Sequence, residues 1–264
     1  MVPNGMAYRE GVPGATRRYL EFLDKHASRA TFFVMGKVAL EYPGLVREIL
    51  DRGHEVACHS HAHVPLERLG EDGFRKDLEE NLQALARAGV GQPHGYRAPT
   101  FSLIRETCWA YPILHEYGIN YSSSVLPAGN PLYGWPGFGR EPRVISGVTE
   151  IPVTLSESPF LRVPYAGGIY LRVLPALLTR FWCRQSLKKN VAVVSYLHPY
   201  DIDDAQERFM HPGINCNRFF NWLMYLNRRT VLAKLEGILR LGYRIIPYRE
   251  YVSGLLSDAE TGDK

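Results

Sequence analysis

Three histidines fall within the six residues 58–63, between an apolar run and a polar stretch. His59 and His63 are four residues apart, so in a coiled segment both imidazoles would share one face and could bind one metal ion. A bare pair with this spacing is more often two polar residues near a helix start. An arginine motif at 97–101 and a Leu-His-Pro motif at 197–199 follow, and they strengthen the prediction of a metal site.

The neighbours of the pair have simpler interpretations. His61 is expected to point to the opposite side, and Cys58 to pack on the other face of its strand. Asp201 and Asp203 follow His198, and they either orient that imidazole or cap the next turn. Both alternatives stay open.

The composition is that of an ordinary globular protein, with 264 residues of which 45% are hydrophobic and 22% charged. The net charge of +4 does not favour nucleic-acid binding. The four cysteines are scattered, which indicates a reduced compartment rather than a disulfide framework. Residues 1–15 lack the apolar core of a signal peptide, and no apolar run reaches the ~20 residues that span a bilayer. We therefore expect a cytoplasmic protein.

The chain alternates strand and helix patterns. Strands are expected at 30–35, 54–59, up to 97, and at 120–126, 149–155, 191–197 and 243–247, with helices at 40–50, 74–85, near 112 and at 231–239. The loop 127–142 is long enough to be a lid or a substrate wall. This pattern predicts an α/β fold with a mainly parallel sheet or barrel. His59, Arg97 and His198 each follow a strand, and active sites of parallel barrels lie at that end.

Four motifs together resemble the polysaccharide deacetylase family, also known as the NodB-homology or carbohydrate esterase 4 family. They lie at residues 29–36, 53–63, 95–102 and 196–199, and the resemblance extends from about Gly14 to Tyr251. The bacterial exopolysaccharide and O-antigen cluster members are the most similar kind. The resemblance implies one deacetylase-like domain over residues 1–264, folded as a distorted (β/α)7-type barrel.

The resemblance also implies roles for individual residues. His59 and His63 match the ligands of a divalent ion, most often zinc, and His198 matches the acid that protonates the departing amine. Arg97 matches the arginine that orients a base aspartate. The backbone N–H near Thr100 matches the oxyanion donor, and Phe101 beside it is a candidate substrate contact. The family's fourth motif is not evident, and Gly167 and Gly168 in that region either let a sugar approach the backbone closely or form a turn. A metal with two such ligands and one carboxylate keeps positions open for water and substrate.

One part of the family pattern is missing. The third ligand and the base should be paired aspartates after a first strand, but Glu10 lies in a polar stretch and Asp24 inside a helix pattern. Either the chain begins downstream of that strand, or the protein has lost these groups. In both cases we expect the chain as given to be catalytically impaired, since loss of a general base alone costs about 10²–10⁴-fold.

The implied function is metal-dependent hydrolysis of an N-acyl group, normally acetyl, from an amino sugar in surface-polysaccharide or O-antigen biosynthesis. One alternative is a catalytically inactive carbohydrate-binding member of the family, and another is a metal-free hydrolase of a small cyclic amide. The basic segment 172–189 is either the outer face of a barrel helix or a contact with the membrane, which would suit a lipid-linked sugar. Segment 217–229 is a candidate apolar surface or dimer contact.

Overall fold

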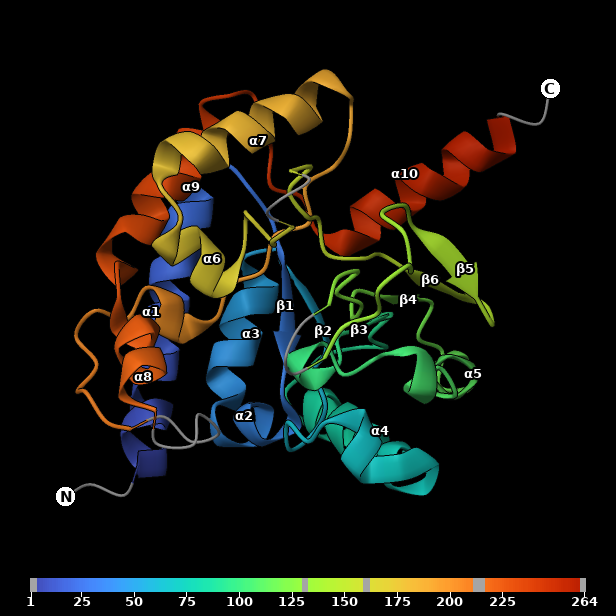
Figure 1. The fold of residues 1–264 in the computed structure, drawn as a ribbon. Coiled ribbons are helices and arrows are strands. Elements are labelled where there is room, and N and C mark those ends of the chain that lie inside the picture. The colour runs from blue at the N-terminus through green and yellow to red at the C-terminus, as the bar shows by residue number, and fades with distance from the viewer. Residues whose placement is uncertain (1–3, 130–132, 159–161, 211–216, 262–264) are drawn as a thin grey trace. The chain divides into compact units, whose positions relative to one another are not determined.

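The computed structural model describes residues 4–129, 133–158, 162–210 and 217–261. These residues divide into two compact units. The sheet unit consists of Ala27–Val153 with Ile245–Lys264, and the helical unit of Met1–His26 with Thr154–Arg244. Figure 1 shows the chain coloured by residue number. Among the described residues, no helix is both long and apolar enough to cross a bilayer.

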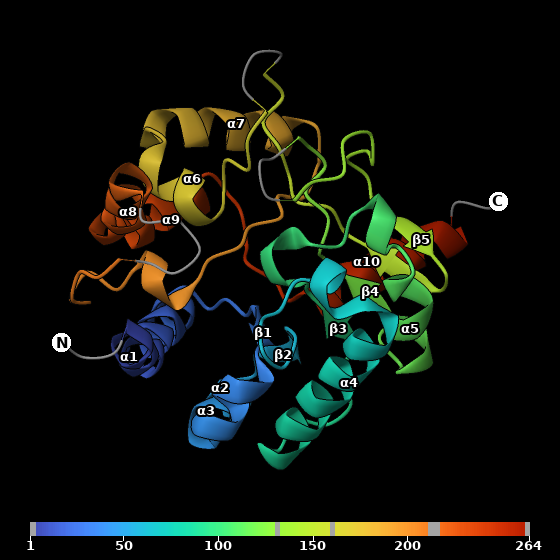
Figure 2. The same cartoon turned by 60° about the horizontal axis from the view of Figure 1, so that its bottom comes forward.

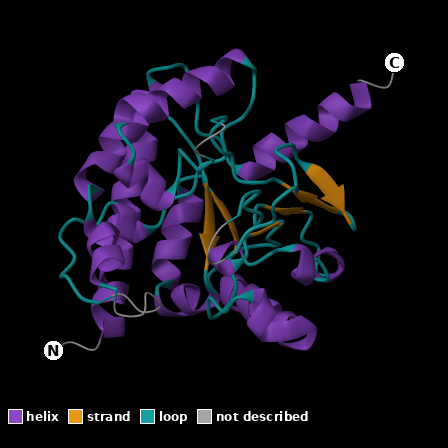
Figure 3. Cartoon of the chain, viewed as in Figure 1, coloured by secondary structure: helices purple, strands orange, loops and turns teal. Residues whose placement is uncertain are grey.

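A six-stranded sheet forms the centre of the described part of the sheet unit (Figure 3). Its order is β1-β2-β3-β4-β6-β5, and all neighbouring strands are parallel except β5 and β6. The strands are β1 Thr31–Val34, β2 Glu55–Cys58, β3 Gly95–Tyr96, β4 Tyr121–Ser122, β5 Arg143–Ile145 and β6 Val148–Glu150. The predicted α/β class with a mainly parallel sheet is confirmed.

The helices of this unit follow the strands in the predicted order. They are α2 Gly36–Glu41, α3 Pro43–Asp51, α4 Leu66–Arg87, α5 Ala110–Glu116 and α10 Tyr248–Thr261, with short 3-10 helices at Pro99–Phe101 and Arg105–Thr107. Pro112 lies in the first turn of α5, where the missing amide hydrogen costs no helical bond, and the helix begins just before it.

The two faces of the sheet are packed differently. One face carries Cys58 and Tyr96, and the Tyr96 ring lies 5.5 Å from that of Phe74 on α4. Cys58 is fully buried, and burial raises the pKa of its thiol, so it serves packing. The other face carries Phe33 and Tyr121, and both rings pack against Tyr248 at the start of α10.

The helical unit contains the remaining helices, seen from two directions in Figures 1 and 2. They are α1 Asn4–Lys25, α6 Gly168–Val173, α7 Ala176–Lys188, α8 Arg218–Tyr225 and α9 Val231–Leu239, with 3-10 helices at Pro199–Asp201 and Arg228–Thr230. Tyr165, Ala166, Trp182 and Cys183 form a buried core, onto which Ile238 of α9 packs.

Two predicted strands are absent from the structure. Segments 191–197 and 243–247 have no strand assignment, although their apolar, β-branched pattern is typical of strands. Val194 donates its N–H to the side-chain hydroxyl of Thr154 instead of to a strand carbonyl. The prediction for 191–197 was wrong because a side chain supplies this acceptor, and the prediction for 243–247 was wrong as well. The missing first strand stays a prediction.

The loop predicted as a lid lies in the sheet unit, and residues 130–132 of it are outside the described residues. Phe138 is buried, and its ring lies 5.0 Å from that of Trp135. The backbone N–H of Trp135 donates to the Leu126 carbonyl. The described part of the loop is therefore packed on its own aromatic residues, and its role toward substrate stays a prediction.

Candidate functional site

His59 directly follows β2 at the carboxyl end of the parallel strands. Its backbone N–H donates to the Val34 carbonyl at the end of β1, and its Nδ1 lies 2.8 Å from the Arg97 carbonyl oxygen. A carbonyl can only accept, so Nδ1 carries the proton and the imidazole lone pair lies on Nε2. Metal-binding histidines are commonly oriented by this kind of backbone bond.

The structure brings the His59 and His63 rings together. Their centroids are 5.0 Å apart with an interplanar angle of 76°. The chain does not achieve this by coiling, as the spacing suggested. Ser60 and His63 instead have positive φ angles of 64° and 59°, and the Ser60 hydroxyl accepts the His63 N–H at 2.9 Å. Two left-handed residues therefore turn the loop back on itself.

Asp77 of α4 holds this loop in place. Its two carboxylate oxygens accept the N–H groups of His61 and Ala62, at 2.8 and 3.2 Å, and the side chain is almost fully buried. On the other side, the first N–H groups of α2 donate to the carbonyls of Ser60 and His61. Asp77 was missed from the sequence, although it falls on the apolar stripe of its helix, next to Leu78, where a solvated acid has no place.

His61 points away from the pair, as predicted. A Cβ placed on Gly36 would lie 2.2 Å from the His61 Nδ1 atom, so this imidazole packs against the start of α2. Gly36 is thus required by close packing. The His61 Nε2 atom is 4.0 Å from the Glu80 carboxylate, which makes His61 part of the support rather than of the pair.

We tested whether these residues fit a divalent ion. Two close imidazoles, one with its tautomer fixed by a carbonyl, suit zinc. However, the described residues contain no group of three His, Cys, Asp or Glu side chains that could hold a metal ion. Catalytic zinc sites normally have three protein ligands. His59 and His63 thus fit two of the three ligand positions, and the described residues do not provide the third.

Arg97 extends from the end of β3 over the face of the sheet that carries Phe33. Its Nε and Nη2 donate to the carbonyl and hydroxyl oxygens of Ser123 at 2.8 and 2.9 Å, and Nη2 also donates to the Tyr248 hydroxyl at 2.7 Å. The guanidinium carbon lies 4.4 Å from the centre of the Phe33 ring. No carboxylate of the described residues pairs with Arg97, whereas the resemblance implies one.

Thr100 and Phe101 follow Arg97 and Pro99 with φ angles of 54° and 59°. Two consecutive non-glycine residues in the left-handed region are uncommon and mark a strained turn. Thr100 is exposed, and its hydroxyl donates to the Pro99 carbonyl at 2.7 Å, which stabilises the turn. The predicted role of this backbone as an oxyanion donor stays a prediction.

Besides Asp77, the described part of the sheet unit has two buried carboxylates that the sequence pattern does not indicate. Glu150, at the end of β6, accepts the N–H groups of Ser124 and Val125 at 2.7 and 2.9 Å. Glu150 is in register with Ser122, and Ser122 with Tyr96. Glu150 therefore lies on the face of the sheet that packs against α4. Burial raises the pKa of Glu150, although these hydrogen bonds act in the opposite direction. Glu55 lies at the start of β2. Neither carboxylate accompanies the imidazole pair.

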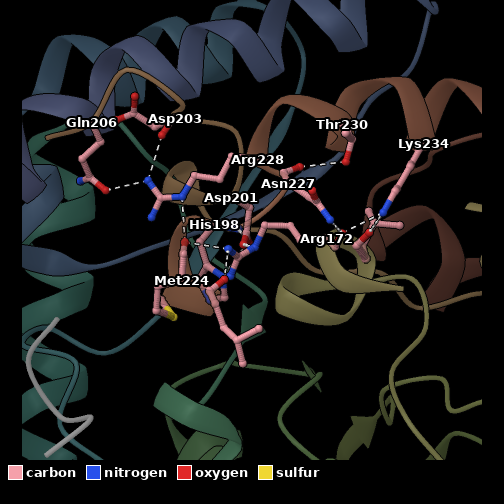
Figure 4. Close-up of polar contacts among 12 residues, drawn as sticks. Arg172, His198, Asp201, Asp203, Gln206, Met224, Asn227, Arg228, Thr230 and Lys234 are labelled. Atoms are coloured by element: carbon pink, nitrogen blue, oxygen red, sulfur yellow. Dashed lines mark hydrogen bonds and ion pairs between the residues drawn. The ribbon is translucent and has the colours of Figure 1, made fainter. Parts of the chain in front are cut away.

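His198 belongs to the helical unit and forms a cluster of its own (Figure 4). Asp201 accepts hydrogen bonds from the His198 backbone N–H at 2.8 Å and from Nδ1 at 3.1 Å. The His198 side chain is 39% exposed, whereas Asp201 is fully buried. Asp201 therefore both caps the following turn and orients the imidazole. That His198 faces the imidazole pair stays a prediction.

Arg172 holds Asp201 from the opposite side. The two side chains are buried and form an ion pair at 2.8 Å, and the Arg172 Nη1 donates to the carbonyls of Leu223 and Met224. Burial acts to raise the pKa of Asp201, but the hydrogen bond from His198 and the charges of His198 and Arg172 lower it. The sequence interpretation of Arg172 as part of an exposed basic face was wrong.

Gly167 and Gly168 are covered by the ring of Tyr196. A Cβ on Gly167 would lie 2.4 Å from that ring, and the Gly168 N–H donates to the Tyr196 carbonyl at 2.7 Å. Close packing against Tyr196 thus explains why both positions are glycine. Their predicted contact with substrate stays a prediction.

The chain matches two family models, and their boundary falls within β4. Residues 5–121 match the polysaccharide deacetylase model. Residues 123–246 match a domain of unknown function (DUF3473).

Three known proteins illustrate the similarity. A peptidoglycan-N-acetylglucosamine deacetylase of Bacillus cereus is 31% identical over 32% of this chain and 30% of its own length. A chitooligosaccharide deacetylase of Rhizobium leguminosarum bv. trifolii is 33% identical over 29% of this chain and 35% of its own length. A Mycobacterium smegmatis structure assigned to the polysaccharide deacetylases matches with a TM-score of 0.62 and 22% identity, over 93% of this chain and 78% of that one.

The matched segment spans about a third of the length of these curated relatives. The structural match shows the fold, and the family model covers the segment that holds the imidazole pair and the arginine motif. Residues 5–121 are thus similar in sequence to the polysaccharide deacetylase family.

Proposed function

We propose that this protein removes the N-acetyl group from an amino sugar of a polysaccharide or oligosaccharide by metal-dependent amide hydrolysis. The observation that carries the proposal is the His59–His63 pair at the carboxyl end of a parallel sheet, with the Nδ1 proton of His59 held by the Arg97 carbonyl. It is supported by the names of the relatives, which are deacetylases of peptidoglycan N-acetylglucosamine and of chitooligosaccharides.

Each residue has a definite task in this proposal. His59 and His63 would hold the ion, which when bound lowers the pKa of water and polarises the amide carbonyl. The backbone at Thr100 would donate to the developing oxyanion. His198 would give a proton to the departing amine, and the ionised Asp201 would stabilise the charge on that imidazole.

The contacts of Arg97 show that the described residues lack a general base at this site. Its guanidinium binds Ser123 and Tyr248, and no described carboxylate pairs with it to act as the base. The same observation favours a second candidate function, a carbohydrate-binding member of the family that does not hydrolyse its ligand. The two candidates share a sugar ligand and differ in acetate release.

The experiment measures acetate released from N-acetylated chito-oligosaccharides and from peptidoglycan fragments, with zinc added. Because the described residues provide no base, the proposal expects slow release, and a chelator and His63→Ala should both abolish it. His94→Ala, at an exposed histidine of the same unit, should have no effect. Sugar binding without acetate release would establish the second candidate. Acetate release that neither chelator nor His63→Ala changes would refute the metal mechanism.

The wider setting stays a proposal. A role in surface-polysaccharide or O-antigen biosynthesis, a lipid-linked substrate and a cytoplasmic location rest on the motif resemblance and on sequence patterns. The identity of the metal is likewise proposed from the ligand types, because imidazole is a common ligand of zinc.

A further inference from the structure

Helix α7 of the helical unit carries an exposed row of apolar side chains. Leu177 is 79% exposed and Phe181 is 51% exposed, and they lie one turn apart on the same face. Leu187 and Val191, at the end of the helix and just beyond it, are 43% and 39% exposed. Figure 1 shows α7 as a continuous helix of this unit.

The core of the unit does not need this row. The opposite face of α7 already packs inward through Trp182, Cys183 and Ser186, which are buried. The Trp182 ring lies 5.7 Å from that of Tyr165, within the core. Helix α7 is therefore apolar on two faces, whereas a surface helix normally has one apolar face.

Basic residues continue the same exposed row. Arg184 and Lys188 follow Phe181 at intervals of three and four residues, so they fall on the face of Leu177 and Phe181, and both are exposed. No acidic residue occurs between Glu157 and Asp201 in the sequence, while six basic residues do. Of these, Arg172 is used in the buried ion pair, and Lys189 pairs with Glu157.

We propose that this face of α7, defined by Leu177, Phe181, Arg184 and Lys188, binds the surface of an anionic lipid membrane. Apolar and basic side chains in one exposed row match the interfacial region, where acyl chains lie below negatively charged headgroups. A second copy of this chain fits worse, because a two-fold contact would set these cations against each other or against the apolar side chains, and α7 has no acidic residue to pair with them. Nucleic acid would leave Leu177 and Phe181 without apolar partners.

The test is sedimentation of the full chain with vesicles of phosphatidylcholine alone or mixed with phosphatidylglycerol. We expect binding to the anionic vesicles only, weakened by salt. Arg184→Gln with Lys188→Gln should weaken it about 25-fold, because each basic residue near such a surface contributes about fivefold. Leu177→Asn with Phe181→Asn should weaken it about 100-fold, from the lost apolar burial of two large side chains.

Matched controls exist on other exposed positions. Leu256→Asn and Arg240→Gln change a 55% exposed leucine and a 75% exposed arginine elsewhere, and they should leave binding unchanged. The proposal fails if anionic vesicles are not bound, if neutral vesicles bind equally, or if the α7 variants bind like the controls. A dimer that Leu177→Asn with Phe181→Asn dissociates, without vesicle binding, would establish a second copy as the partner. This proposal does not depend on the deacetylase activity, so either can fail alone.

Discussion

Replacing Asp77 by alanine tests how the imidazole loop is positioned. The buried carboxylate accepts two backbone N–H groups, from His61 and Ala62. Hydrogen bonds to a charged group contribute about 1.5–3 kcal/mol each, and water can partly replace them at this half-buried loop. We therefore expect Asp77→Ala to lower the free energy of unfolding by about 2–4 kcal/mol, measured by urea denaturation.

The same substitution should weaken zinc binding. Loss of a group that positions metal ligands typically costs about 10–100-fold in affinity, which a competition titration against a chromophoric chelator measures. The zinc affinity and stability of Asp77→Asn should lie between those of the wild type and Asp77→Ala. The amide keeps one acceptor oxygen but turns an NH₂ group toward the second backbone N–H. Asp72→Ala, an exposed acid of the same helix, should change stability by less than about 0.5 kcal/mol.

Two results would refute this reasoning. If Asp77→Ala and Asp72→Ala have the same stability, then the two hydrogen bonds do not hold the loop. If Asp77→Ala is less stable but binds zinc as tightly as the wild type, then the loop does not position the imidazoles.

Three further predictions follow from buried charges and close packing. Because the folded-state pKa of Asp201 is lowered, its contribution to the free energy of unfolding is present above about pH 4. This contribution is lost as the pH falls through the folded pKa. Asp201→Asn should thus cost about 3 kcal/mol at pH 7 in urea denaturation, less in acid, and a pH-independent cost would refute the ion pair. The raised pKa of Glu150 predicts the opposite sign: Glu150→Gln should gain stability over the wild type as the pH rises above about 4, and a loss that grows with pH would contradict this. Gly36→Ala should lower the thermal midpoint through a clash with His61, costing about 1–3 kcal/mol, whereas Gly44→Ala meets open space in α3 and should not destabilise; equal effects would rule the clash out.

The parallel sheet could be predicted because its strands are short apolar runs between helical repeats, and the polar residues His59 and Arg97 follow two of these strands. The proximity of His59 and His63 was also expected from their spacing, but for the wrong local reason. The left-handed Ser60 and His63 depend on hydrogen bonds that the loop donates to Asp77 and accepts from the start of α2. Contacts between residues far apart in sequence leave no periodic signal.

The helical unit was harder to predict for the same reason. Arg172 lies in a segment without acids, so its sequence context indicates an exposed cation, yet its partner Asp201 follows 29 residues later. Segment 191–197 has the pattern of a strand, but Val194 bonds to the Thr154 side chain. Asp201 was recognised as a candidate partner of His198, and only the structure decided that it both caps and orients.

The most direct test of the central claim is the zinc stoichiometry of the purified chain after equilibrium dialysis, measured by atomic emission. We expect one ion per chain at saturation, lost in His59→Ala and in His63→Ala and retained in His94→Ala. Zinc that remains after either substitution, or no zinc binding by the unaltered chain, would contradict the assignment of these two imidazoles as metal ligands.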